Sequence, residues 1–220
     1  MTTAAGWDWN EALQAMPGRW TEVADELFPF AGEMHEQGCR RVYDLGCGVG
    51  RHSVFLARQG FSVTASDISS SAIEQTRRRL DRAGTDATLL QIDMRDWPFD
   101  DGCFDAVVAY NVVYHAERDE VESVLAEAHR TLRPGGLLFI TFKSTLDSQC
   151  GEGRELAPLT WAPVSGVERG IAHYYVDEAE AKRLLKDFEL LSMVLKQELP
   201  IPGGSERHRA HWVIRARRPA

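Results

Sequence analysis

Residues 42–53 read VYDLGCGVGRHS, in which three glycines at every second position follow an apolar run. The apolar residues predict a buried strand over 41–46, and Ser53 starts a helical pattern. A glycine inside a helix or strand costs about 0.5–1 kcal/mol relative to alanine, so three together need a reason. They indicate a turn from strand to helix, at which the backbone bends sharply and main-chain N–H groups face a ligand.

Strands and helices alternate along the rest of the chain. Apolar runs and amphipathic spacing predict strands over 61–66, 87–92, 104–110, 137–142, 188–197 and 208–217, and helices over 52–59, 71–83, 119–132 and 177–186. Ser71 and Glu74 have capping-box spacing, so the second of these helices is expected to begin at Ser71. The order is typical of a doubly wound α/β fold, in which helices cover both faces of a mostly parallel sheet of seven strands. The last two strands predict an antiparallel hairpin at the sheet edge.

Three regions of one domain are expected within residues 1–220: an N-terminal helical lid over 1–38, a ligand-binding core over 39–143, and a loop with the closing strands over 144–220. The lid carries Trp7, Trp9 and Trp20. The stretch 144–175 contains several glycines and prolines, and its length is typical of a functional or mobile loop.

Charge and cysteine usage narrow the function classes. The formal net charge is −8 at pH 7, which argues against a protein that binds nucleic acid or anionic membranes non-specifically. No apolar run has the length of a membrane span and the first residues lack the layout of a secretory signal, so a cytoplasmic protein is expected. The four cysteines include no C-x-x-C pair, so neither disulfides nor a structural zinc site is expected.

The spacing of the glycines distinguishes between nucleotide ligands. A dinucleotide-binding turn has the pattern G-x-G-x-x-G, with a third glycine that allows close packing of the helix. Gly46 and Gly48 fit the first two positions, but Arg51 occupies the third. This argues against a nicotinamide-dependent oxidoreductase, which stays open as an alternative.

Five motifs in order point to a different nucleotide. They are Asp44-Leu45-Gly46-Cys47-Gly48-Val49-Gly50, Asp67 at the end of the second strand, Asp93-Met94 after the third, Phe104 to Asn111 along the fourth, and Leu132-Arg133-Pro134-Gly135-Gly136 before the fifth. With these motifs, which cover residues 41–143, the chain resembles the class I S-adenosylmethionine-dependent methyltransferases. The resemblance implies S-adenosylmethionine as cofactor and S-adenosylhomocysteine as product.

The resemblance also implies roles for single residues. The main chain of the glycine turn approaches the carboxylate of the methionyl part, and Asp44 lies near the sulfonium and amino group. Asp67 accepts hydrogen bonds from both ribose hydroxyls, and Asp93 with Met94 contacts the adenine edge. Asp44 and Asp67 could instead cap helices or lie in turns, and Asp96 is an alternative to Asp93. The full set expected at the cofactor is Asp44, Gly46, Cys47, Gly48, Gly50, Asp67, Ile68, Asp93, Met94 and Asn111.

Methyl transfer proceeds by in-line attack on the sulfonium methyl, for which neither an oxyanion hole nor a metal ion is expected. Alignment and exclusion of water supply most of the rate, together with one base for a protonated acceptor. Tyr114 and His115, after the fourth strand, and His173 are the candidate catalytic residues. Alternatively, Tyr114 packs on the cofactor, His115 caps the next helix, and His173 is a packing or surface residue. Three residues of the last hairpin either line the acceptor pocket or are exposed: Arg207, His208 and His211.

The acceptor is expected to be a small molecule. Residues 111–114 read NVVY and lack the N/D-P-P-Y pattern of amino-methyltransferases that act on DNA. The stretch 151–212 is similar to bacterial small-molecule methyltransferases of the ubiquinone and tellurite-resistance types. No nucleic-acid or membrane partner is expected, and the chain is either a monomer or a homodimer. A non-catalytic protein that binds S-adenosylmethionine or S-adenosylhomocysteine stays open as an alternative.

Overall fold

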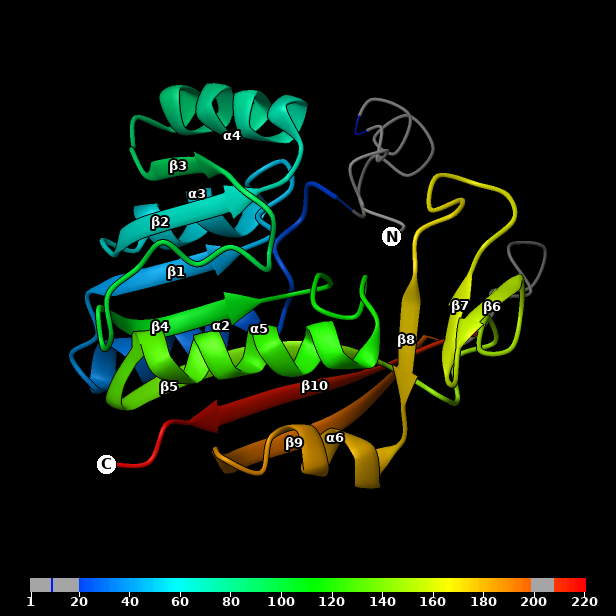
Figure 1. The fold of residues 1–220 in the computed structure, drawn as a ribbon. Coiled ribbons are helices and arrows are strands. Elements are labelled where there is room, and N and C mark those ends of the chain that lie inside the picture. The colour runs from blue at the N-terminus through cyan, green and yellow to red at the C-terminus, as the bar shows by residue number, and fades with distance from the viewer. Residues whose placement is uncertain (1–8, 10–19, 199–207) are drawn as a thin grey trace.

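The chain folds into one sheet with helices packed against it (Figure 1). The computed structural model describes residue 9, residues 20–198 and residues 208–220. The strands are β1 (Arg41–Leu45), β2 (Ser62–Asp67), β3 (Thr88–Gln91), β4 (Phe104–Ala109), β5 (Leu132–Ser144), β6 (Arg154–Ala157), β7 (Thr160–Ala162), β8 (His173–Val176), β9 (Glu189–Glu198) and β10 (Arg209–Arg217). The helices are α2 (Leu27–Glu36), α3 (Arg51–Arg58), α4 (Ser70–Ala83), α5 (Arg118–Thr131) and α6 (Glu178–Leu184).

The seven strands expected from the sequence lie side by side in the order β3-β2-β1-β4-β5-β10-β9. β3, β2, β1, β4 and β5 run parallel, and β10 is antiparallel to both β5 and β9. β1 pairs with β2 on one side and with β4 on the other, so the direction of winding reverses between β1 and β4. In an open parallel sheet, the carboxyl ends of the strands at such a reversal form a crevice for ligands.

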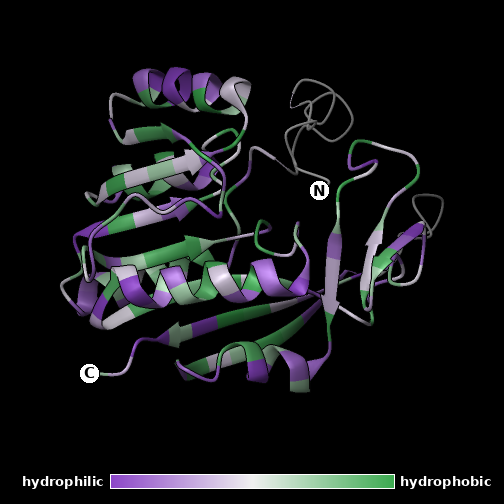
Figure 2. Ribbon diagram, viewed as in Figure 1, coloured by the Kyte–Doolittle hydropathy of each residue, from purple (hydrophilic) through white to green (hydrophobic). Residues whose placement is uncertain are grey.

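Apolar side chains form a separate core on each face of this sheet. Val107 and Ala109 of β4 pack with apolar residues of α5 and α6, whereas Ala106 and Val108 pack with α2, α3 and α4. Alternate residues of a strand point to opposite faces, so a strand buried on both sides is apolar throughout. Figure 2 shows these hydrophobic strands beneath helices of mixed hydropathy. Within the described residues, no helix is both long and apolar enough to cross a membrane.

The expectation that residues 144–175 are irregular is wrong in part. Three short strands, β6 to β8, lie in or overlap this stretch and pair antiparallel with one another. β8 also continues the main sheet, because Lys143 and Ser144 of β5 pair in parallel with Tyr175 and Val176. The stretch is therefore a small β-arm fixed to the carboxyl end of β5.

Several element ends differ from the expected ones. α4 is capped by Ser69, whose Oγ accepts a hydrogen bond from the Ala72 N–H at 3.3 Å, two residues before the expected Ser71. Glu74 pairs with Arg78 on the surface of the helix. β5 begins at Leu132, before the Pro-Gly-Gly turn, with an irregularity in its pairing to β4. Within the expected N-terminal helical region, the described helix is α2; residues 7–8 and 10–19 lie outside the described residues.

Candidate functional site

A cavity lies at the carboxyl ends of β1 to β4, where the winding reverses. Its walls come from the turns after these four strands, from the start of α5 and from two tryptophans. The lining residues are Trp9, Trp20, Gly46, Cys47, Gly48, Val49, Arg51, His52, Ser66, Asp67, Ile68, Ile92, Asp93, Met94, Arg95, Tyr110, Asn111, Val112, His115 and Glu120. Eight of the ten residues expected at the cofactor are in this wall, and Asp44 and Gly50 are not.

The glycine turn presents bare main chain to the cavity. Gly48 has φ +56°, a left-handed conformation, and a Cβ at this position would lie 2.6 Å from the ring of Trp9. Its N–H donates to Asp67 Oδ2 at 2.9 Å, and its carbonyl accepts from Thr76 Oγ1 at 2.9 Å. Any side chain at residue 48 would therefore both strain the turn and fill the cavity.

Asp67 combines a buried carboxylate with open acceptor capacity. Besides the Gly48 N–H, it accepts the Ser69 N–H through Oδ1 at 2.9 Å. Burial raises the pKa of this carboxyl, against the effect of both hydrogen bonds. Each carboxylate oxygen has two lone pairs, so both oxygens can still accept a hydrogen bond from a ligand in the cavity.

Asp44 lies behind the glycine turn instead of in the cavity wall. It is 1% exposed, and its Oδ2 accepts a 2.6 Å hydrogen bond from Ser53 Oγ of α3. Burial raises the pKa of this carboxyl to about 7, although Ser53 and Arg51 oppose the shift. The carboxyl therefore links β1 to α3 behind the glycine turn.

Asp93 is held in place by a neighbour that the sequence analysis missed. Arg95 makes a two-pronged contact with it, through Nε to Oδ1 at 2.7 Å and Nη2 to Oδ2 at 2.6 Å, and a further contact with Glu120 of α5. The hydrogen bonds from Arg95 lower the pKa of Asp93, which stays ionised. Asp93, Met94, Arg95 and Glu120 all line the cavity. Arg95 and Glu120 are 25 residues apart, so no local sequence pattern indicates their contact.

Asn111, directly after β4, has a positive φ of 57°. Its N–H donates to Thr141 Oγ1 at 2.8 Å, and Thr141 Oγ1 donates to Asn111 Oδ1 at 3.2 Å. Asparagine tolerates the left-handed region better than most residues. The contact with β5 therefore fixes the direction of the Asn111 side chain at the cavity.

Of the three candidate catalytic residues, His115 is the one in the cavity wall. Burial lowers the pKa of His115 to about 4, although Glu168 opposes the shift. The alternative that His115 caps the next helix is wrong, because Glu117 forms the cap of α5 in a capping box with Glu120. Tyr114 is 2% exposed and packs beside His115, with ring centroids 4.6 Å apart, outside the cavity wall.

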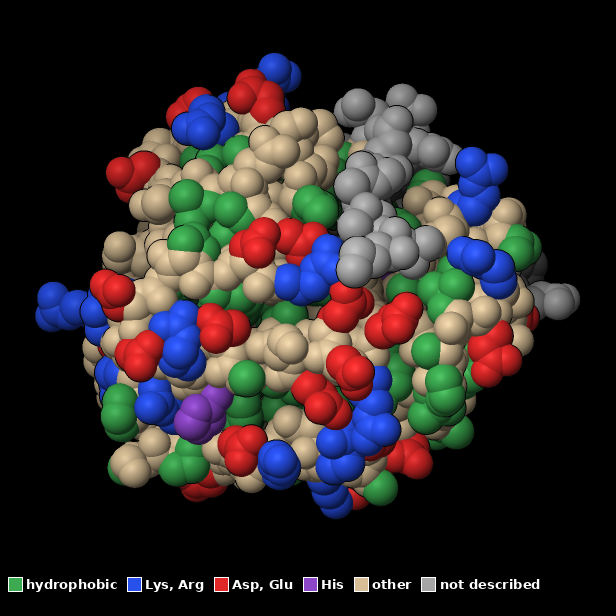
Figure 3. Space-filling model, in the orientation of Figure 1, with side chains coloured by type: hydrophobic (Ala, Val, Ile, Leu, Met, Phe, Trp, Pro, Cys, Tyr) green, Lys and Arg blue, Asp and Glu red, His purple; other side chains and the backbone are tan. Residues whose placement is uncertain are grey.

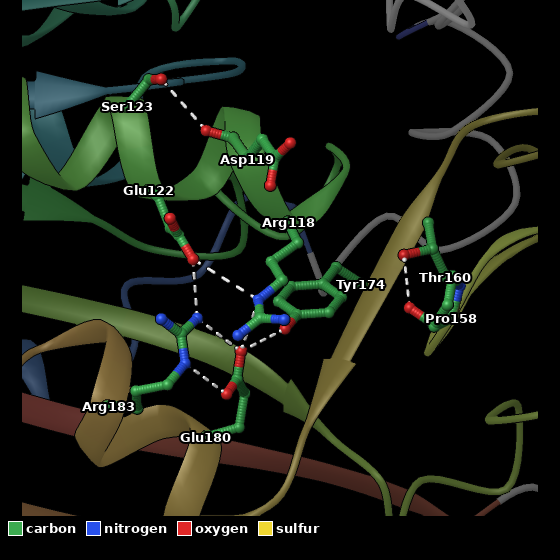
Figure 4. Close-up of polar contacts among 9 residues, drawn as sticks. All are labelled: Arg118, Asp119, Glu122, Ser123, Pro158, Thr160, Tyr174, Glu180 and Arg183. Carbon is green, nitrogen blue, oxygen red and sulfur yellow. Dashed lines mark hydrogen bonds and ion pairs between the residues drawn. The ribbon is translucent and has the colours of Figure 1, made fainter.

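His173 lies behind His115. It is fully buried on β8, and its ring centroid is 5.0 Å from that of His115. Adjacent Tyr174 ties β8 to the helices by donating a hydrogen bond to Glu180, which also pairs with Arg118 of α5 and Arg183 of α6 (Figure 4). The packing interpretation of His173 fits its burial, and the surface interpretation is wrong.

Two tryptophans of the expected lid border the cavity. The Trp9 and Trp20 rings meet edge to face with centroids 5.6 Å apart, and both line the cavity. Trp7 lies outside the described residues, as does Arg207 of the last hairpin. His211 lines a second, neighbouring groove, which shares Arg51, Tyr110 and Asn111 with the main cavity.

Comparisons with known proteins agree with this architecture. A family model described as a methyltransferase domain matches residues 42–136. Demethylmenaquinone methyltransferase of Clavibacter sepedonicus is 40% identical over 120 residues, which are 53% of this chain and 44% of that protein. A SAM-dependent methyltransferase of Methanosarcina mazei superposes with a TM-score of 0.73 at 21% identity, over 90% of this chain and 99% of that one. TehB from Haemophilus influenzae gives a TM-score of 0.62 at 20% identity, over 85% of this chain and 62% of that one.

These likenesses differ in what they show. At such low identities the solved structures show the fold alone. The chain spans about half the length of the curated relatives it matches. Those relatives are named for RNA acceptors as well as for small molecules. The family match, taken with the five motifs and the sheet order, establishes that residues 42–136 are a methyltransferase domain of the class I S-adenosylmethionine-dependent family.

Proposed function

We propose that this protein binds S-adenosylmethionine in the cavity and transfers its methyl group to a small protic acceptor. One observation carries the proposal: within the methyltransferase domain, a buried carboxylate and a bare glycine turn face one cavity at the reversal of the sheet. A nucleoside with a charged amino-acid tail needs both features, an acceptor for its hydroxyls and N–H groups for its carboxylate.

The residues in the wall fit that cofactor. Asp67 would take the ribose hydroxyls, and the turn at Gly46 and Gly48, which has no side chains, would let the carboxylate of the methionyl part approach the main chain. Asp93, held ionised by Arg95, would accept from the adenine amino group, beside Met94. The other members of the proposed cofactor set are Cys47, Ile68 and Asn111 in the wall, and Asp44 and Gly50 behind it.

The bound cofactor would supply an electrophilic methyl group, and the chain would supply alignment, a dry site and a base. Trp9 and Trp20 cover the glycine turn with apolar surface, which excludes water and strengthens the polar contacts beneath it. His115 is neutral at pH 7, since its pKa is lowered to about 4, so it can take a proton from an acceptor. Tyr114 and His173 would support His115 from behind, outside the cavity wall.

A small-molecule acceptor is favoured over a nucleic acid. The net charge of −8 opposes a polyanionic partner. On the face shown in Figure 3, acidic and basic side chains are interspersed instead of forming one basic surface. The cavity is lined by tryptophan, tyrosine, methionine and valine, which suits a compact acceptor with apolar surface.

The test has two steps. Calorimetric titrations with S-adenosylmethionine, S-adenosylhomocysteine and NADH should show binding of the first two and not of NADH. Release of S-adenosylhomocysteine is then measured over a panel of hydroxyl, amine and thiol acceptors, with short RNAs included. Binding without turnover on any acceptor would favour a non-catalytic binding protein, and binding of NADH alone would remove the proposal.

A matched pair of variants tests the base. His115→Ala should slow turnover by about 100-fold or more while cofactor affinity stays nearly unchanged, because the ring acts on the acceptor. His35→Ala, on the exposed side of α2, is the control. A loss of affinity and turnover together would make His115 a structural residue.

A further inference from the structure

Three charged or polar side chains form a chain of contacts behind His115. Lys143 of β5 places its Nζ 3.2 Å from Nδ1 of His173 on β8. On the other side of the same ring, Nε2 lies 3.4 Å from Oε2 of Glu168, in the loop before β8. A ring nitrogen of His115, a carboxylate oxygen of Glu168 and a ring nitrogen of His173 lie within 4.8 Å of one another. The cluster therefore joins the β-arm to the cavity wall.

Hydrogen-bond chemistry fixes the tautomer of His173. A lysine ammonium has three donors and no acceptor, and this one also donates to Gln149 Oε1 at 3.1 Å. Nδ1 of His173 must therefore accept, which leaves the ring hydrogen on Nε2, on the side of the ring that meets Glu168. At 3.4 Å, the contact between Nε2 and Oε2 is close but does not have the geometry of a hydrogen bond. Burial and the Lys143 charge both lower the pKa of His173, so the ring is neutral.

The same tautomer argues against a metal ion, although two imidazoles and a carboxylate are a common donor set for transition metals. A ligating nitrogen must offer a lone pair, whereas Nε2 of His173 carries the hydrogen. A ligating histidine also normally donates its other N–H to an acceptor, and here the other nitrogen meets a cation. The fold instead places the Glu168 carboxylate close to both imidazole rings.

We propose that Glu168 is a positioning residue of the methyl-transfer site, placed beside His173 and His115 so that its carboxylate stabilises protonated His115. The inference rests on the proposed function. In the step, the acceptor's O–H or N–H proton goes to the His115 ring and the freed electron pair forms the bond to the methyl carbon. The pair of the carbon–sulfur bond stays on sulfur. The positive charge on His115 then lies beside Glu168, while Lys143 is on the far side of His173.

Three variants test the role: Glu168→Gln, Glu168→Asp, and Glu155→Gln as the control on the exposed strand β6. Calorimetry should give the same S-adenosylhomocysteine affinity for all three, because Glu168 is outside the cavity wall. For any acceptor turned over by the parent protein, Glu168→Gln should lower kcat about tenfold or more with KM nearly unchanged. Glu168→Asp, which keeps the carboxylate, should recover part of the lost kcat.

A spectroscopic measurement makes the test independent of the acceptor. Nitrogen-15 NMR of the histidine rings should show the hydrogen of His173 on Nε2. Among the described residues, the titratable or charged groups near His115 include Glu168, Lys143, His173 and Tyr114, and Glu168 is the one that raises its pKa. Removal of this carboxylate should therefore lower the pKa of His115 in Glu168→Gln and not in Glu155→Gln.

The outcomes separate this inference from the proposed function. A parent protein that does not bind S-adenosylhomocysteine overturns both. If the parent protein binds and turns over its substrates, but Glu168→Gln matches the Glu155→Gln control in rate and in the pKa of His115, the role of Glu168 alone is overturned. Stoichiometric binding of Zn²⁺ or Co²⁺ that His173→Gln abolishes would show a metal site and overturn the assigned tautomer.

Discussion

Asp67 serves two purposes with one carboxylate. It ties the end of β2 to the glycine turn after β1 through the Gly48 N–H, and it holds the start of α4 through the Ser69 N–H. These bonds fix the carboxylate before a ligand arrives, so a ligand would meet an acceptor that does not have to reorganise. Burial raises its pKa, and the two hydrogen bonds limit that rise.

Replacement of Asp67 tests this residue directly. Asp67→Ala should weaken S-adenosylmethionine binding by about 1.5–3 kcal/mol, the usual contribution of hydrogen bonds to a charged group. Calorimetry measures the loss, and thermal unfolding without ligand shows how much comes from the turn itself. The control is Asp96→Ala, which removes an exposed carboxylate from the loop after β3. Equal affinities for both variants would place Asp67 outside the binding site.

At the scale of elements, the cluster in Figure 4 links α5, α6 and β8. Glu180 accepts hydrogen bonds from Tyr174 and Arg183 and pairs with Arg118. The hydrogen bonds from Arg183 lead the causes that lower the pKa of Glu180 to about 2, even though burial opposes them. A carboxyl whose pKa is lowered in the folded protein stabilises the fold at pH values above its ordinary pKa. This stabilisation is lost as the pH falls through the pKa that the group has in the folded protein.

Glu180→Gln should therefore lower the free energy of unfolding by about 1–3 kcal/mol at neutral pH. The difference from the parent protein should shrink between about pH 4 and about pH 2. Urea unfolding at several pH values measures it. Glu178→Gln on the same helix removes an exposed pair with Lys182 and should cost about 0.5 kcal/mol or less. Equal effects of the two variants would mean that the cluster does not hold β8.

The strands that the sequence predicts and those it misses differ in what stabilises them. Apolar runs identify the seven strands of the main sheet because these pack against the two cores: Val107 and Val108 of β4 lie in opposite cores, and even the four-residue β3 lies within the apolar run 87–92. β6 to β8 have three or four residues each and depend on pairing with one another and with the end of β5. They lie in a stretch that contains several glycines and prolines and has no clear apolar period, so the β-arm could not be predicted.

The residues of the candidate site divide in the same way into those that the sequence predicts and those that it misses. Residues next to strand ends, such as Gly48, Asp67 and Asn111, could be located because parallel strands bring their carboxyl ends together. Arg95 and Glu168 could not, because their partners are set by tertiary packing. Arg95 meets Glu120 across 25 residues, and Glu168 meets a histidine that only the fold of the β-arm positions.

At the scale of the whole molecule, the residues that border the cavity are spread over the first half of the chain, from Trp9 to Glu120 of α5. A ligand in it should therefore stabilise the entire domain against unfolding. At 100 times its dissociation constant, S-adenosylhomocysteine should add about 2.7 kcal/mol, which corresponds to a rise in Tm of roughly 5–10 °C for a chain of this size. NADH at the same concentration is the control, and an equal rise with both would contradict a specific site.

The β-arm enters the main sheet at β5, through the pairs Lys143–Tyr175 and Ser144–Val176, and β4 separates β5 from the strands that carry the glycine turn and Asp67. An insertion in the hairpin of β6 and β7 would thus leave the residues of the cavity wall in place. The end of β5 is accordingly a junction at which the arm could be exchanged as one unit, provided that Glu168 and His173 are kept beside His115.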